Sequence, residues 1–206
     1  MVNRVLFFVD GFNLYHALQE RKCYRKYKWL DYSLLAKCYV SRNDKIVGVL
    51  LFTAYAHWNP KKEQRHRVLI TALQLKGVEV VFGKFKNRDR VCRLCHKCYK
   101  SFEEKYTDVN IAIRLFQAAI NDEFDTAIII TADSDLVPAI KGIKKNFPAK
   151  QIGLVTPIGR SSIELKDICD FRMKMKEKHL RTSQLPETIV LDSTKGIILQ
   201  RPSTWR

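Results

Sequence analysis

The chain has 206 residues, 46% of them apolar, which is enough for one globular domain with a hydrophobic core. Its 37 Lys and Arg residues outnumber 21 Asp and Glu residues, and the net charge of +16 favours polyanionic partners such as nucleic acids. The apolar runs are too short to span a membrane or to form a signal peptide, so we expect a cytoplasmic protein with reduced cysteines.

Strand and helix patterns alternate along most of the chain. The expected strands, rich in apolar and β-branched residues, are 4–9, 46–55, 78–82, 126–130, 151–155 and, at an edge, 169–173. The expected helices, with apolar residues at helical spacing, are 12–21, 32–39, 62–75, 108–120, 136–147 and 161–167. This alternation predicts an α/β fold in which helices cover both faces of a mostly parallel sheet.

Two segments depart from the alternation. Residues 84–105 are basic and cysteine-rich with little apolar periodicity, so we interpret them as an ordered insertion within a domain covering residues 1–173. Residues 174–206 form a basic, proline-containing C-terminal tail, and we expect its part from residue 185 onward to lie along the domain surface.

Short carboxylates occur where predicted strands end or helices begin. Asp10 closes the first strand, Asp133 and Asp135 follow the most apolar strand, and Asp108 opens a helix. Strand ends and the following helix starts share one edge of a parallel sheet, where ligands bind. Carboxylates gathered at that edge repel each other unless a hard cation such as Mg²⁺ or Mn²⁺ joins them. The pattern therefore predicts a metal site on a basic protein.

Each of these residues also has a purely structural interpretation. Asp10 is a good helix N-cap, Asn13 fits an exposed turn, and Asp108 is a first-turn acid that a helix dipole stabilises. Capping and metal binding are compatible, because helix N-termini favour negative charge.

Three segments, taken in order, resemble the NYN domain family, LabA-like relatives of the PIN-domain nucleases. The segments are residues 9–13 (VDGFN), 104–109 (EKYTDV) and 131–135 (TADSD). The sequence departs mildly from the family pattern, with Thr131-Ala132 where Ser-Gly is common and Tyr106 where Gly is common.

The resemblance implies a three-layer α/β/α, PIN-like sandwich and a Mg²⁺- or Mn²⁺-dependent ribonuclease. Matched residue by residue, it places the metal-binding acids at Asp10, Asp108, Asp133 and Asp135, with Asn13 beside them. A cation held there lowers the pKa of bound water and neutralises phosphate charge.

The leading functional hypothesis is a metal-dependent endoribonuclease that hydrolyses RNA phosphodiester bonds. One alternative is a catalytically weak RNA-binding adaptor of the same fold. Another is a phosphatase of small substrates, which the net charge of +16 disfavours. No pattern in the chain indicates an oligomeric state.

The insertion carries cysteines at C-x₂-C-x₂-C spacing, Cys92, Cys95 and Cys98. In a reduced compartment this spacing favours structural Zn²⁺ bound by thiolates. The local pattern lacks a fourth ligand. We name His66, whose helix precedes the strand leading into the insertion, with His57 and His96 as alternatives. The alternative to a zinc site is three free thiols in a basic loop.

The insertion also combines cations with aromatic residues. The candidate RNA-binding cations are Lys84, Lys86, Arg93, Lys97, Lys100 and Lys105. They alternate with Phe85, Tyr99 and Phe102, and phosphate attraction plus base stacking is a workable way to bind single-stranded RNA. A solvated lysine loop whose phenylalanines pack on the domain is the equally simple alternative.

Overall fold

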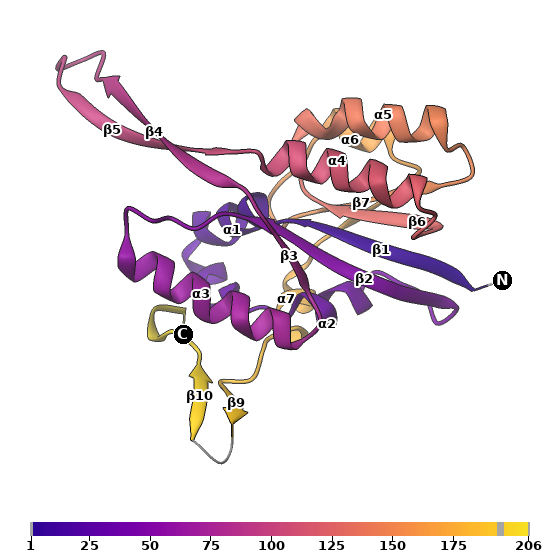
Figure 1. Ribbon diagram of the computed structural model, residues 1–206, viewed down its shortest axis with the longest axis horizontal. Coiled ribbons are helices and arrows are strands. Elements are labelled where there is room, and N and C mark those ends of the chain that lie inside the picture. The colour runs from indigo at the N-terminus through magenta and orange to yellow at the C-terminus, as the bar shows by residue number, and fades with distance from the viewer. Residues whose placement is uncertain (1, 193–195, 206) are drawn as a thin grey trace.

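The computed structural model describes residues 2–192 and 196–205. Within these residues, six strands form a parallel sheet in the order β3-β2-β1-β6-β7-β8 (Figure 1). The strands are β1 (Asn3–Asp10), β2 (Asp44–Thr53), β3 (Glu79–Phe82), β6 (Thr126–Ile130), β7 (Gln151–Thr156) and β8 (Phe171–Lys174). The α/β prediction is confirmed, and β8 lies at the sheet edge as expected.

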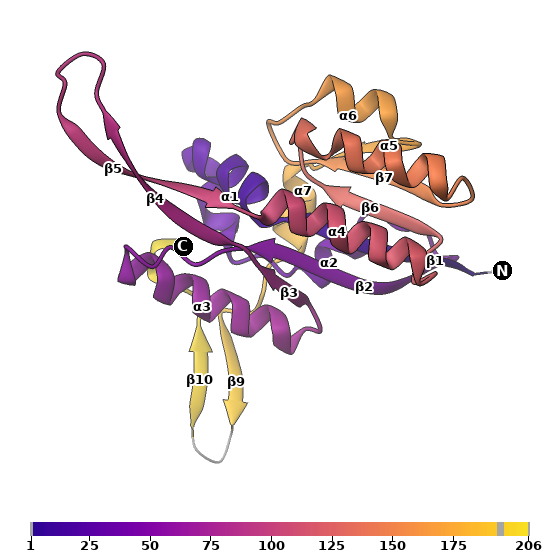
Figure 2. The same cartoon turned by 45° about the horizontal axis from the view of Figure 1, so that its top comes forward.

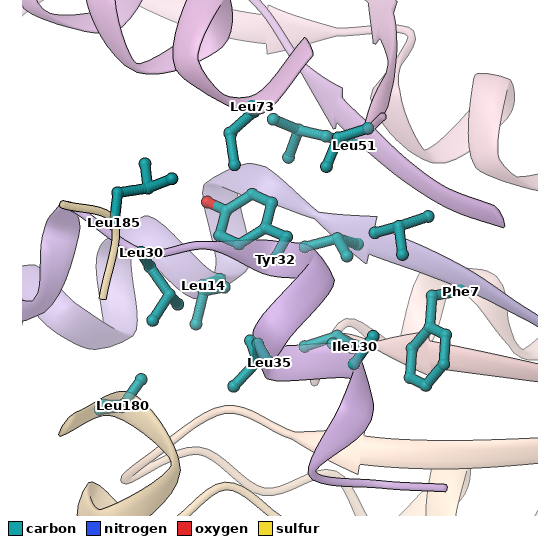
Figure 3. Packing of buried hydrophobic residues seen from close by; sticks show 14 of the residues in the cluster. Phe7, Leu14, Leu30, Tyr32, Leu35, Leu51, Leu73, Ile130, Leu180 and Leu185 are labelled. Carbon is teal, nitrogen blue, oxygen red and sulfur yellow. The ribbon is translucent and has the colours of Figure 1, made fainter. Parts of the chain in front are cut away.

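Helices cover both faces of the sheet. One face packs α1 (Gly11–Glu20), α2 (Tyr32–Lys37), α3 (Pro60–Leu75) and α7 (Glu177–Thr182) into a core that includes Phe7 (Figure 3). The other face packs α4 (Thr107–Ile120), α5 (Val137–Asn146) and α6 (Ile163–Ile168) against a core that includes Phe8. Short 3₁₀ turns, η1 (Lys22–Lys28), η2 (Ser134–Leu136) and η3 (Ser203–Trp205), complete the connections.

The central position of strand β1 in the sheet explains why its sequence is continuously apolar. It pairs in parallel with β2 on one side and β6 on the other, so both faces are covered. Phe7 and Phe8 are both fully buried, on opposite faces, because successive strand residues point to opposite sides of a sheet. The strand therefore delivers its last residue, Asp10, to a rigid position between β2 and β6.

The cysteine-rich insertion is an antiparallel hairpin of β4 (Lys84–Val91) and β5 (Cys98–Lys105). Its pairing begins with Lys84 opposite Lys105 and ends with Val91 opposite Cys98. The hairpin projects away from the sheet as an arm (Figure 2). Its outer half is exposed on both strands, which explains why its sequence lacks an apolar period.

The C-terminal tail is more deeply integrated than the sequence indicates. The hairpin of β9 (Thr188–Asp192) and β10 (Ile197–Gln200) extends outward, but Leu185 and Trp205 are buried in the main core. Trp205 packs on Trp29, whose indole nitrogen donates to the carbonyl of Pro186 at 2.7 Å. The surface placement expected from residue 185 onward is therefore wrong for these anchors, which are too widely spaced to form a periodic pattern.

No helix in the part of the chain that the structure describes has both the length and the apolar character needed to cross a bilayer.

Candidate active site

The carboxyl ends of β1 and β6 are adjacent, and hydrogen bonds join the loops that follow them. Asp10 is 3% exposed and caps α1 by accepting from the backbone N–H of Asn13 at 3.0 Å. Its other oxygen accepts from the Thr131 hydroxyl at 2.8 Å, and that hydroxyl accepts from the Asp133 N–H at 3.0 Å. Thr131 thus fixes Asp10 and the loop carrying Asp133 relative to each other.

Asn13 makes a second connection between the same loops. Its side-chain oxygen accepts from the backbone N–H of Ala132 at 3.1 Å. The turn that permits this starts at Gly11, where an added Cβ would lie 2.7 Å from the Phe52 carbonyl oxygen. Only glycine fits there, so the site depends on the close approach of β2 to the start of α1.

A further acid joins the cluster from the hairpin. Asp10, Glu104, Asp108 and Asp133 line one cavity of about 310 Å³, and Asn13 lines it too. Asp135 does not line this cavity, but its charge acts on Asp108. Its N–H donates to the Asp133 carboxylate at 3.1 Å, so Asp133 also caps the short turn η2 that carries Asp135.

The carboxylates destabilise one another's charged forms. Burial, with the Glu104 and Asp133 charges adding to it, raises the pKa of Asp10 to about 6. Burial and then the charges of Asp133, Asp10 and Asp135 raise the pKa of Asp108 to about 6. Burial also raises the pKa of Glu104. A cavity that holds several costly negative charges is a natural place for a cation.

The donor chemistry fits a hard metal ion. Among the described residues, Oε1 of Glu104 is buried without a hydrogen-bond partner, and carboxylate oxygens are the ligands that Mg²⁺ and Mn²⁺ prefer. As they stand, no three His, Cys, Asp or Glu side chains of residues 2–192 and 196–205 form a group that could hold a metal ion.

One arginine lies in the wall of the acidic cavity, and two lysines lie at the base of the neighbouring hairpin. Arg160 lines it and pairs with Glu20, while its Nε is buried with no hydrogen-bond partner among the described residues. Lys84 and Lys86 lie over the exposed ring of Tyr106, at 4.7 and 5.9 Å from its centroid. Arg160 is therefore positioned to neutralise an anion bound in the cavity.

The remaining predicted RNA contacts are spread along the hairpin. Lys105 pairs with Glu103 at 3.2 Å rather than with Asp108. Arg93, Lys97 and Lys100 are exposed in its outer half. The structure therefore separates the candidate RNA-binding cations into a group at the base of the hairpin and a group toward its tip.

The predicted zinc ligands are not gathered into one place. Cys92, Cys95 and Cys98 lie at the hairpin turn, where backbone amides and the Cys95 side chain hold the pKa of the Cys92 thiol below its usual value. His66 lies on α3, its Nε2 3.3 Å from the Thr53 hydroxyl, and burial lowers its pKa to about 4.

The two alternative histidines are also separate from each other. His57 pairs with Glu63 at 3.0 Å, on the loop before α3 and on α3 itself. His96 lies within the cysteine turn, where its backbone has φ +53°.

Comparison with known proteins assigns the family. The sequence pattern of the NYN domain matches residues 4–174. The chain belongs to the NYN domain family. This is a family of PIN-like nucleases, which typically use a divalent metal ion and act on nucleic acid.

Two individual proteins resemble this NYN protein along most of its length. The 6-hydroxy-3-succinoylpyridine 3-monooxygenase HspA of Pseudomonas putida is 25% identical over 98% of this chain and 75% of its own length. The crystal structure of VPA0982 from Vibrio parahaemolyticus, a protein of unknown function, superimposes with a TM-score of 0.60 and 19% identity. It covers 89% of this chain and 96% of its own, and supports the fold alone.

Two residues of the NYN site escaped the sequence reasoning. Glu104 belongs to the insertion, and only the register of the hairpin, with Glu104 opposite Phe85, brings it back to the acids. Thr131 ends an apolar strand and gives no charge signal, although its hydroxyl connects Asp10 to Asp133. Its position two residues before Asp133 and four before Asp135 was the available clue.

Proposed function

We propose that this NYN protein is a metal-dependent endoribonuclease that hydrolyses phosphodiester bonds of single-stranded RNA. The observation that carries the proposal is one cavity, lined by four acids, in which burial and then neighbouring negative charge raise the pKa of Asp10, Glu104 and Asp108. Keeping four neighbouring acids ionised without a cation is energetically unfavourable, because their charges repel one another. The same acids with Mg²⁺ or Mn²⁺ would form a phosphate-binding centre.

The residues proposed to hold the metal are Asp10, Asp108, Asp133 and Asp135, together with Glu104. When bound, the ion would supply a low-pKa water and charge neutralisation for the phosphate. Thr131 and Asn13 would hold the two loops in place, because their hydrogen bonds join α1 to the 131–135 turn. Preset ligands of this kind lower the cost of organising the site when RNA arrives.

Phosphate binding is proposed for the cations at the rim. The orphaned Nε of Arg160 offers a buried donor to a phosphate oxygen. Lys84 and Lys86 lie over Tyr106 at the base of the hairpin, and Arg93, Lys97 and Lys100 lie farther out along it. Cations spread along an extended arm favour an extended single strand over a compact substrate.

A structural Zn²⁺ at Cys92, Cys95 and Cys98 is a separate proposal. The lowered pKa of Cys92 at the hairpin turn supports thiolate formation, which zinc binding requires. His96 lies in the same turn, whereas His66 bonds to Thr53, so His96 replaces His66 as the favoured fourth ligand. Elemental analysis should find close to one zinc per chain, absent from a Cys92→Ser, Cys95→Ser variant. Protein purified without chelators and free of zinc would contradict this site.

The decisive experiment uses purified protein and end-labelled single-stranded RNA with Mg²⁺, Mn²⁺ or EDTA. Internal cleavage that requires the metal is the expected result. RNA binding without cleavage in either metal would favour the adaptor alternative. Hydrolysis of small phosphate esters but not of RNA would favour the phosphatase.

A second candidate function rests on a different observation. An aromatic cavity beside the acids and the similarity to HspA favour a substituted pyridine as a small-molecule substrate. Calorimetry with 6-hydroxy-3-succinoylpyridine tests this candidate, and the absence of binding at millimolar ligand would eliminate it.

A further inference from the structure

A second cavity, about 290 Å³ in volume, lies next to the acidic one. The two cavities share lining side chains, namely Phe12, His16, Phe85 and Phe102. A ligand that fills both would place an aromatic ring on one side of these residues and an anionic group on the other. Only the acidic cavity is used by the metal chemistry proposed above.

The walls of the second cavity are aromatic and tightly packed. Trp58 stacks on Phe102 with centroids 3.9 Å apart and ring planes 9° apart, and meets Phe85 edge-on at 4.5 Å. Phe85 in turn contacts Phe12 edge-on at 5.2 Å. Trp58 remains 39% exposed despite these contacts, so part of a large π-surface faces solvent beside the acids. Such surfaces are where unpaired bases stack.

A polar group lies deep in the same cavity. Lys28 is 9% exposed, lines the cavity, and donates to the side-chain oxygen of Gln19. Its ammonium lies 4.8 Å from the centroid of the Tyr15 ring. An ammonium has three N–H donors, so Lys28 has donor capacity left for a ring carbonyl. Largely apolar and aromatic walls with a small number of placed polar groups are typical of a site that orients a flat heteroaromatic ring.

We propose that this cavity, the base pocket, holds one unstacked nucleobase of the RNA beside the phosphate to be cleaved. The proposal rests on RNA being the substrate. It goes beyond that function because it makes a single base, and not the backbone alone, select the cleavage position. Lys28 would favour bases that carry a carbonyl oxygen at the buried edge.

The test is a series of short RNAs, each lacking the base at one position. Binding is measured in the Asp133→Asn variant, so that cleavage does not consume the RNA. We expect one abasic position to weaken binding about tenfold, with little effect elsewhere. In the cleavage-competent protein, that position should be adjacent to the bond that is cut.

Variants assign the sensitive position to the base pocket. Trp58→Ala should abolish the position-specific loss, and Trp58→Phe should restore most of it. Phe82→Ala is the matched control, because Phe82 is an exposed aromatic residue of β3 outside both cavities and outside the hairpin. It should leave the position-specific loss intact.

Each outcome is informative. Equal losses at all abasic positions, or an unchanged pattern in Trp58→Ala, would overturn the base pocket even if RNA is cleaved. A position-specific loss that depends on Trp58, in a protein that fails to cleave RNA, would support the base pocket and refute the endoribonuclease.

Discussion

The acidic sheet edge and the β4–β5 hairpin differ in how firmly their side chains are held. The edge is fixed: Asp10 is buried between paired strands, and side-chain hydrogen bonds from Thr131 and Asn13 hold its loops. The hairpin is exposed over its outer half, and its charged side chains pair mainly with one another, as Arg90 does with Glu103. Catalysis needs groups in fixed positions, whereas binding an RNA backbone needs cations spread over a distance. On the proposed function, the fold gives the first task to the sheet edge and the second to the hairpin.

The largest effect should come from removing an acid. Asp10→Asn and Asp133→Asn should each lower kcat by at least about a hundredfold while RNA affinity changes little, because the missing carboxylates serve the metal. Single-turnover cleavage with parallel binding measurements checks this. Asp89→Asn on the exposed face of β4 is the control and should retain full activity. Full activity of Asp133→Asn, or of the wild type in EDTA, would remove the acidic edge from the chemistry.

A smaller effect should follow from loosening the edge without removing an acid. Thr131→Val deletes the hydroxyl that donates to Asp10, and that hydrogen bond lowers the pKa of Asp10. We expect kcat to fall about tenfold and the acidic limb of the pH–rate profile to move to higher pH.

Thr131→Ser keeps the hydroxyl and should restore both the rate and the profile. If the pH–rate profile of Thr131→Val matched that of the wild type, the hydroxyl would have no role beyond packing.

Substitutions in the outer hairpin should weaken RNA binding and leave the catalytic step largely unchanged. Lys97→Glu with Lys100→Glu should raise KM more than it lowers kcat. The salt dependence of RNA affinity should flatten by about 0.7 in log–log slope for each phosphate that the variant no longer neutralises. Affinity measured across a salt series decides the point, and an unchanged slope would make the outer hairpin structural only.

The smallest effect concerns folding stability. The pKa of Asp108 is raised to about 6, so its protonated form is favoured in the folded state and its charge costs stability as pH rises through 6. Because solvent screens this half-buried group, Asp108→Asn should stabilise the protein by only about 1–2 kcal/mol at pH 8, and the gain should disappear below about pH 4. Thermal unfolding across pH measures this, and a destabilised variant at pH 8 would contradict the assigned electrostatics.

Sequence reasoning succeeded where local chemistry and topology coincide. Asp10 and Asp133 could be placed together because parallel strands end at one edge, and the strand signals of β1 and β6 are strong. Glu104 could not be placed with them from the sequence, because its position depends on the register of an exposed hairpin without apolar alternation. The burial of Trp205 could not be predicted either, since a single buried residue after a polar segment forms no periodic pattern. The base pocket could not be predicted from the sequence, because it forms only where the fold stacks Trp58 on Phe102.

The root of the hairpin has an evolutionary consequence. Lys84 lies opposite Lys105, so the arm leaves and rejoins the domain at neighbouring points. Just before it, Gly83 packs so closely that an added Cβ would lie 2.8 Å from the Lys105 carbonyl oxygen, which fixes that junction. Beyond Phe85 and Phe102 the arm can therefore lengthen, shorten or be exchanged between homologues without disturbing the sheet. On the proposed function, this arm is where RNA specificity could change during evolution while the acids stay in place.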